Sequence, residues 1–249
     1  MSAYEALAGC YDELTYDIRY EKTLTFFERL CAREQVQPHL VLDLACGTGK
    51  LTLELLRRGA DVIGTDLSPE MLAMAQKNCA RKGFSPLLLL QDMRELDLYG
   101  TVDVAVCATN SLNYLQNGEE LRTVFSKVQN FLTPGGLFFF DINSLCKFEK
   151  LYGDNTYVFE GNGGYCVWQN RYKKSKKQCD FLLTIFKAEK DGLYSRHEEE
   201  QRQCYFSPAS LEKTLKETGF ELIFKGRDYR GSPSQEKDGD VFYLAVCRK

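Results

Sequence analysis

Residues 41–50 read VLDLACGTGK, and this stretch decides the fold expected for the chain. Its first apolar residues suit a strand that is buried on both faces of a parallel sheet. Gly47 and Gly49 follow at once, and glycine lets the main chain turn tightly and approach a ligand closely. A helix is predicted from residue 50 to about residue 58, so its free amide groups would face whatever lies over the turn.

A chain of 249 residues is long enough for one α/β domain with an insertion or for two small domains, and we favour one domain with an insertion. Its formal net charge of −3 offers no overall positive field to attract nucleic acid or acidic membranes, so a small-molecule partner is expected and nucleic acid is disfavoured. Ten scattered cysteines form no CxxC pair, which is typical of free thiols in a cytoplasmic protein, and no metal site is predicted. No apolar run approaches the length of a membrane span, and monomer and homodimer both stay open.

Apolar strand-like runs alternate with helical patterns from residue 39 to about residue 142, which predicts βαβ units and a parallel sheet. FELIFKGRDY and DVFYLAVCRK add two strands near the C-terminus, joined by a polar loop. The predicted fold class is therefore α/β, with a Rossmann-like seven-stranded, mostly parallel sheet, helices on both faces and an antiparallel β insertion. Ser68 and Ser207, each followed by proline, are predicted helix N-caps.

Residues 144–205 form the insertion, where aromatic and polar residues alternate. We expect an antiparallel meander that turns at 161–164, 173–177 and 191–192. The remaining parts, 1–143 and 206–249, would form the main domain, with N-terminal helices in 1–36 covering the ligand. The insertion would act as a substrate lid or as a dimer element.

Polar residues follow each strand of the predicted parallel sheet. Because the carboxyl ends of parallel strands share one edge, and ligands bind where the strand order reverses, this edge is the expected site. The residues are Asp43, Asp66, Asp92, Asn110, Asp141 and Asn143.

The word LDLACGTG resembles the first motif of the class I S-adenosylmethionine-dependent methyltransferases, including Asp43 and Ala45 ahead of the first glycine. A dinucleotide fingerprint would carry a third glycine where Thr52 stands. The resemblance extends over nearly the whole chain and is to the small-molecule branch, similar to glycine and sugar-amine N-methyltransferases. It implies S-adenosylmethionine as the cofactor.

The same resemblance implies roles at successive strand ends. The turn from Ala45 to Gly49 would lie against the methionine portion and the ribose, and Asp66 would accept hydrogen bonds from the ribose hydroxyls. Asp92 would accept from the adenine amine, a feature that a nicotinamide enzyme would not explain. Asp66 as a plain helix N-terminal acid and Asp92 as a surface acid are the alternatives. Leu67, Met71 and the Met93 backbone would flank the adenine.

Tyr11 and Tyr20 match tyrosines in the N-terminal helices of similar bacterial methyltransferases and would hydrogen-bond the cofactor carboxylate. Arg19 is a cationic alternative for that contact. Packing of both tyrosines on an amphipathic helix explains them equally well.

The acceptor end is less specified. CATNSLNYL after the fourth strand lacks the NPPY-like word of DNA amino-methyltransferases, so methylation of a nucleobase amine is disfavoured. Asn110 is expected at the cofactor, with a helix-capping role as its alternative. Core packing is the alternative for the insertion aromatics, and a solvated strand position for the histidine. No general base is identified. The candidate acceptor contacts are Asn113, Tyr114, Asn143, Trp168, Tyr172 and His197.

We therefore expect methyl transfer from S-adenosylmethionine to a nitrogen or oxygen of a small molecule. One alternative is an RNA-modifying methyltransferase that uses the basic run RYKKSKK, although a charged hairpin tip also explains that run. The other alternative is a regulatory module that binds S-adenosylmethionine without turnover.

Overall fold

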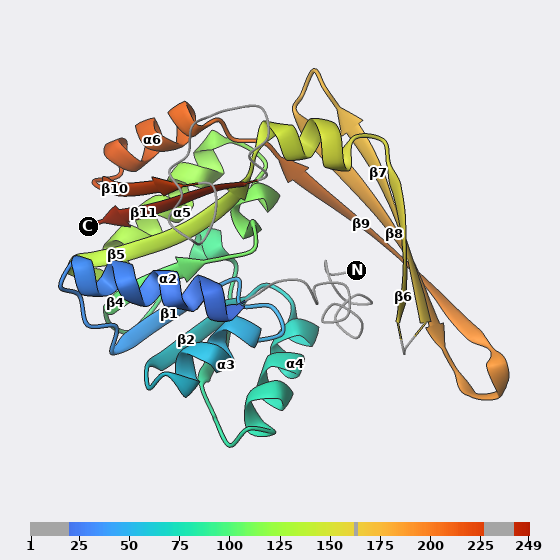
Figure 1. The fold of residues 1–249 in the computed structure, drawn as a ribbon, viewed down its shortest axis with the longest axis horizontal. Coiled ribbons are helices and arrows are strands. Elements are labelled where there is room, and N and C mark those ends of the chain that lie inside the picture. The colour runs from blue at the N-terminus through green and yellow to red at the C-terminus, as the bar shows by residue number, and fades with distance from the viewer. Residues whose placement is uncertain (1–19, 162–163, 227–241) are drawn as a thin grey trace.

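The computed structural model describes residues 20–161, 164–226 and 242–249, arranged around two β-sheets (Figure 1). Tyr11 and Arg19 lie outside the described residues. None of the helices within these ranges is long and apolar enough to cross a membrane.

The larger sheet has seven strands in the order β10-β11-β5-β4-β1-β2-β3. Among the described strands of this sheet, β11 runs in the opposite direction to the others and pairs antiparallel with β10 and β5. This confirms the predicted mostly parallel sheet with its terminal hairpin. The strands are β1 (Leu40–Leu44), β2 (Asp61–Asp66), β3 (Leu87–Leu90), β4 (Val102–Cys107), β5 (Leu132–Asn143), β10 (Glu221–Gly226) and β11 (Phe242–Arg248).

Within the described residues, five α-helices flank the larger sheet, and two of them begin as their caps predict. The Ser68 hydroxyl accepts a hydrogen bond from the Met71 backbone N–H at 3.2 Å, and the Ser207 hydroxyl accepts one from Ser210 at the same distance. Each cap satisfies an amide that the helix itself leaves unpaired. The helices are α2 (Tyr20–Arg33), α3 (Lys50–Arg57), α4 (Pro69–Ala80), α5 (Gly118–Phe131) and α6 (Pro208–Glu217).

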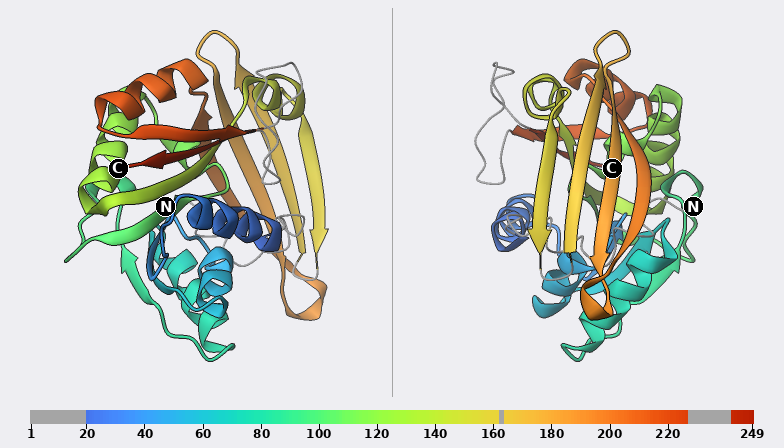
Figure 2. Two further views of the ribbon diagram at one scale, coloured as in Figure 1. Left: turned by 60° about the vertical axis from the view of Figure 1, so that its left-hand side comes forward. Right: turned by 90° about the vertical axis from the view of Figure 1, so that its right-hand side faces the viewer.

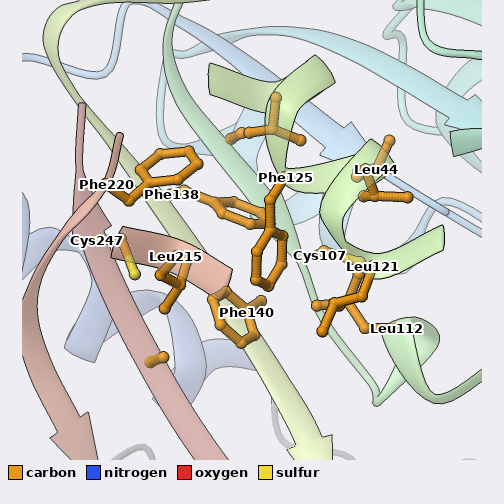
Figure 3. Packing of buried hydrophobic residues seen from close by; sticks show 14 of the residues in the cluster. Leu44, Cys107, Leu112, Leu121, Phe125, Phe138, Phe140, Leu215, Phe220 and Cys247 are labelled. Carbon is orange, nitrogen blue, oxygen red and sulfur yellow. The ribbon is translucent and has the colours of Figure 1, made fainter. Parts of the chain in front are cut away.

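Successive residues of the central strands point to opposite faces of the sheet, which builds two apolar layers. Leu42 and Leu44 face the layer under α5 and α6, where Phe125, Phe138 and Phe140 pack together (Figure 3). Val41 belongs to the opposite layer under α2 and α3. Burial on both faces explains why β1 is apolar at nearly every position.

The second sheet is the insertion, with four antiparallel strands in the order β6-β7-β8-β9. Its strands end and begin next to the positions where the sequence predicts turns, and Figure 2 shows the sheet standing beside the larger one. A short helix, η4 (Lys147–Tyr152), precedes it and was not predicted. The strands are β6 (Thr156–Gly161), β7 (Gly164–Lys173), β8 (Gln178–Ala188) and β9 (Tyr194–Cys204).

A buried hydrogen-bond network joins the two sheets. Asn113 donates its side-chain amide to the Cys204 carbonyl at 2.8 Å and accepts the Asn143 backbone N–H at 2.7 Å. The Asn143 side chain in turn donates to Gln203 at 2.7 Å. Buried amides are stable only when such partners are present, so this network fixes the end of β9 against the end of β5.

Candidate active site

The strand order of the larger sheet reverses at β1, because β1 pairs with β2 on one side and with β4 on the other. Ligands of open α/β sheets bind at the carboxyl ends of strands at such a point. A cavity of about 380 Å³ lies there. The predicted site residues on its wall are Tyr20, Asp43, Ala45, Gly47, Asp66, Leu67, Met71, Asp92, Met93 and Tyr114.

The glycine turn between β1 and α3 has a left-handed backbone at three positions. Ala45, Gly47 and Gly49 have φ angles of 60°, 55° and 75°, in the left-handed region that favours glycine. A Cβ atom at Gly49 would lie 2.8 Å from the Ala75 Cβ, whereas none of the described atoms comes within 4 Å of one at Gly47. Gly49 therefore allows α4 to pack closely, and Gly47 leaves room at the cavity wall.

Asp66 ends β2 and accepts two backbone hydrogen bonds, from Gly47 at 2.8 Å and from Ser68 at 2.9 Å. Burial raises the pKa of this carboxyl group, and the nearby backbone N–H groups of Ser68, Gly47 and Leu67 oppose that rise. A carboxylate has about four acceptor positions on its two oxygens, so Asp66 keeps capacity for two further donors. A vicinal diol at this edge of the cavity would supply such donors.

Asp43 is 2% exposed and accepts a hydrogen bond from the Thr52 hydroxyl at 2.6 Å. Burial raises the pKa of Asp43 to about 6, and the nearby charge of Asp66 adds to the rise. Thr52 occupies the position of the third glycine in a dinucleotide fingerprint. Its hydroxyl instead ties α3 to the end of β1.

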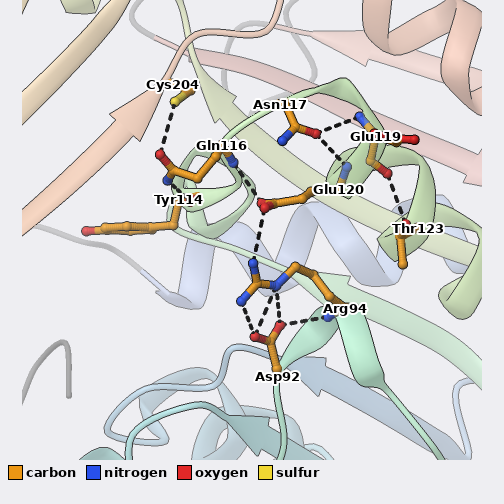
Figure 4. A network of polar contacts seen from close by, with 9 residues as sticks. All are labelled: Asp92, Arg94, Tyr114, Gln116, Asn117, Glu119, Glu120, Thr123 and Cys204. Atoms are coloured by element: carbon orange, nitrogen blue, oxygen red, sulfur yellow. Dashed lines mark hydrogen bonds and ion pairs between the residues drawn. The ribbon is translucent and has the colours of Figure 1, made fainter.

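Asp92, after β3, is held by Arg94 (Figure 4). The Arg94 Nε atom lies 3.0 Å from both carboxylate oxygens of Asp92, and its Nη1 atom donates to Glu120 at 3.2 Å. The guanidinium lowers the pKa of Asp92, so this carboxylate is an ionised acceptor. Glu120 also accepts the Gln116 backbone N–H at 2.8 Å.

Much of this site lies in a stretch that matches a known protein family. Residues 41–136, which hold the turn and the first four strand ends, match the family model described as a methyltransferase domain. A protein of Geobacillus sp. (strain WCH70) named as a methyltransferase is 30% identical over 243 residues, which is 97% of this chain and 98% of that protein. The chain belongs to the S-adenosylmethionine-dependent methyltransferases.

Two further proteins extend this comparison. The crystal structure of an S-adenosylmethionine-dependent methyltransferase from Clostridium acetobutylicum superposes with a TM-score of 0.88 at 27% identity and covers 98% of both chains. A glycine/sarcosine N-methyltransferase of Parasynechococcus marenigrum (strain WH8102) is 26% identical over 241 residues, or 95% of this chain and 80% of that protein.

S-adenosylmethionine is thus the methyl donor of this methyltransferase, and the cavity fits such a ligand. Its volume of about 380 Å³ lies in the usual range for small-molecule sites. The open space at Gly47 and the half-occupied carboxylate of Asp66 suit a ribose. The individual contacts of these residues with the donor stay predictions.

Tyr114, which is predicted to contact the acceptor, lies on the cavity wall. The Tyr114 hydroxyl donates to the Gln201 side-chain oxygen at 2.9 Å, and the Gln201 amide donates to the Glu199 carboxylate at 2.6 Å. Gln201 and Glu199 lie on β9, and each is 7% exposed. A chain of polar groups therefore runs from the cavity into the insertion sheet and ends on a buried carboxylate.

The structure does not bring every predicted residue of the methyltransferase to the described cavity wall. Asn113 and Asn143 are 0% exposed and belong to the network between the sheets. Trp168 packs edge-on against Phe181 with 5.4 Å between ring centroids, in the core of the insertion. Their roles as acceptor contacts stay predictions.

The other predicted residues away from the wall have different surroundings. Tyr172 packs near Phe148 in that insertion core, and His197 is exposed with its Nε2 3.2 Å from the Ser195 hydroxyl. Gly49 and Asn110 belong to the two turns that carry the wall without lining it. An acceptor contact by Tyr172 or His197 and a cofactor contact by Asn110 stay predictions.

Sequence reasoning missed several polar residues that the fold brings to the site. Arg94 stands two residues after Asp92, a spacing that offers a local ion pair and is the one available signal. The others come from segments far apart in the chain, so no local pattern marks them. They are Gln116, Glu120, Glu199 and Gln201.

Proposed function

We propose that this methyltransferase transfers a methyl group from S-adenosylmethionine to the nitrogen of a small-molecule amine. The observation that carries the proposal is the polar chain from Tyr114 through Gln201 to the Glu199 carboxylate. It supplies hydrogen-bond acceptors and a negative charge behind Tyr114 on the cavity wall. The similarity to a glycine/sarcosine N-methyltransferase supports the same class of acceptor.

Methyl transfer to a neutral amine requires little acid–base catalysis by the protein. S-adenosylmethionine supplies an electrophilic methyl group on a sulfonium, and the sulfur departs with the electron pair of the broken S–C bond. The nitrogen lone pair of a neutral amine forms the new N–C bond, and an N–H proton passes to water afterwards. Alignment and exclusion of water can supply most of the rate enhancement.

Tyr114 has the chemistry to align an amine. Its hydroxyl donates to Gln201, and a phenol oxygen is also an acceptor, which is the chemistry that a substrate N–H needs. The negative charge of Glu199 favours the positively charged ammonium product, because Coulomb attraction is stronger in a buried site than in water. A hydroxyl acceptor would need a base instead.

At the donor end, we assign the methionine and ribose portions to the turn with Tyr20, Asp43, Ala45 and Gly47, and the ribose hydroxyls to Asp66. Leu67, Met71, Asp92 and Met93 would surround the adenine. The insertion, residues 144–205, would cover the acceptor. The basic run is less suited to RNA, because Lys173 pairs with Asp180 at 2.5 Å and Lys177 lies over the Tyr205 ring.

Calorimetric titration with S-adenosylmethionine, followed by transfer from an isotopically labelled methyl donor, tests the proposal. The panel contains glycine, sarcosine and an aminosugar, each beside its hydroxyl counterpart, with an RNA fraction as a further arm. We expect label in one or more amines and none in the hydroxyl counterparts. Label confined to hydroxyls or to RNA would contradict the amine assignment, and tight donor binding without transfer to a broad metabolite extract would favour a regulatory module.

A further inference from the structure

Two consecutive residues at the end of β4 adopt a backbone conformation that is unfavourable for their side chains. Thr109 and Asn110 have φ angles of 60° and 62°, in the left-handed region. Asparagine tolerates this region moderately, but a β-branched threonine rarely adopts it. Such strain persists only where the surrounding structure holds the chain, and it gathers at functional sites.

Asp141, on β5, holds this turn. Its two carboxylate oxygens accept the backbone N–H groups of Thr109, at 3.2 Å, and of Asn110. The side chain is 4% exposed. Burial raises its pKa to about 6, whereas the two N–H donors favour the ionised form. A carboxylate whose burial is unfavourable thus accepts hydrogen bonds from two backbone amides of one strained turn.

The turn positions two parts of the cavity wall. Ala108, Thr109 and Ser111 line the wall, and the short helix η3 (Ser111–Tyr114) that follows carries Tyr114. The Asn110 carbonyl accepts the Asn113 N–H at 3.0 Å, so the left-handed pair sets the start of that helix. The end of β5 therefore holds the loop at its beginning through Asp141 and at its end through Asn143.

We propose that Asp141 is a positioning residue for methyl transfer, which keeps Thr109 and Asn110 left-handed so that the wall at Thr109 meets the donor and Tyr114 meets the acceptor. This inference rests on the proposed function in taking the described cavity as the donor site and Tyr114 as an acceptor contact. Asp141 itself lies behind the wall, so it acts through the turn and not by contact with the donor.

Asp141→Asn is the direct test, because an amide can accept one N–H but presents its own NH2 group to the other. With S-adenosylhomocysteine as the calorimetric probe, we expect binding to weaken by about fivefold or more, as for a stranded hydrogen-bond donor. Asp103→Asn is the matched control. Asp103 accepts the Leu40 N–H at 2.9 Å between neighbouring strands at the opposite edge of the sheet, so the affinity should stay within about twofold.

A glycine background separates positioning from a general structural role. Glycine adopts left-handed φ without strain, so Asp141→Asn should weaken binding by no more than about twofold when Thr109→Gly and Asn110→Gly are present. A purely structural role predicts the same fold-change in both backgrounds, and that result would overturn the proposal. Unchanged binding by Asp141→Asn in the native background would overturn it as well.

Thermal melting followed by circular dichroism covers the case in which Asp141→Asn does not fold. The glycine background should then restore the folded protein, and failure to fold in both backgrounds would count against the turn as the target of Asp141. Failure of the native protein to bind S-adenosylhomocysteine would contradict the donor site itself, which is a different outcome from native binding that Asp141→Asn leaves unchanged.

Discussion

Gly49 and Ala75 approach each other so closely that a Cβ atom at position 49 would stand 2.8 Å from the Ala75 Cβ. The glycine turn after β1 is thus held against α4, and the Asn78 side chain adds a 3.0 Å hydrogen bond to the Thr48 carbonyl. The second glycine of the motif therefore serves the packing of the turn, while Gly47 leaves space at the cavity wall.

Gly49→Ala should destabilise the fold more than Gly59→Ala does. Both positions are left-handed, with φ of 75° and 89°, but no described atom lies within 4 Å of a Cβ at Gly59. The difference isolates the steric conflict with Ala75, and we expect about 1–3 kcal/mol less unfolding free energy for Gly49→Ala. Urea denaturation measures both variants, and equal losses would contradict the packing role.

Asp66→Ala should weaken the binding of S-adenosylhomocysteine by roughly 1–3 kcal/mol, or about 5- to 150-fold. The cause is the loss of an acceptor for the ribose hydroxyls and for the Gly47 N–H. Asp61→Ala is the control, because Asp61 is exposed at the start of the same strand. Calorimetric titration gives both affinities, and an unchanged value for Asp66→Ala would remove this residue from the ribose site.

Asp92→Asn should reduce the preference for adenine over hypoxanthine. An ionised Asp92 accepts from the adenine amine, whereas an asparagine amide can donate to the hypoxanthine oxygen. We expect the affinity ratio between S-adenosylhomocysteine and S-inosylhomocysteine to fall by about tenfold or more. Asp97→Asn, at an exposed position in the same segment, should keep the native ratio. An unchanged ratio in Asp92→Asn would indicate that Asp92 pairs with Arg94 and does not contact the adenine.

Asp43 should make the stability of the fold depend on pH in an unusual direction. Its pKa is about 6 in the fold and about 4 in an unfolded chain, so the folded state binds more protons between these values. Its contribution to the unfolding free energy therefore rises as the pH falls through 6, by up to roughly 3 kcal/mol. Urea denaturation of native protein and Asp43→Asn across this range should show that the unfolding free energy of the native protein rises relative to that of the variant at lower pH. A constant difference would contradict the raised pKa.

Glu199→Gln should slow methyl transfer to an amine without weakening the binding of the methyl donor. The substitution can keep a hydrogen bond to Gln201 but removes the negative charge near the ammonium product. We expect kcat/KM for the amine that accepts label to fall by about tenfold, or about 1.4 kcal/mol. Glu200→Gln is matched to it, since Glu200 is exposed on the other face of β9. Equal rates in the two variants would argue against the role of Glu199.

Much of the fold could be predicted because its signals are local. Alternating apolar strands and amphipathic helices indicate a parallel sheet, and serine before proline marks two helix starts that the structure confirms. Asp66 and Asp92 could be named because each follows directly on a predicted strand, and parallel strands bring their carboxyl ends to one edge.

The acceptor end depends on contacts between distant segments. Tyr114 and Gln201 are 87 positions apart, and Asn113 pairs with Cys204 across 91. No local spacing distinguishes an asparagine that faces a cavity from one that joins two sheets, so the burial of Asn113 and Asn143 in the network between the sheets could not be predicted from the sequence.

The sequence by itself determined the parallel sheet, the glycine turn and the methyl donor, because each depends on residues adjacent in the chain. The tertiary structure decided which polar groups share the cavity. It brought Glu120 to Arg94 beside Asp92, Gln201 and with it Glu199 to Tyr114, and Asp141 to the strained turn at Thr109. Hydrogen bonds and burial join residues that are close in space, and the packing of the two sheets sets those distances.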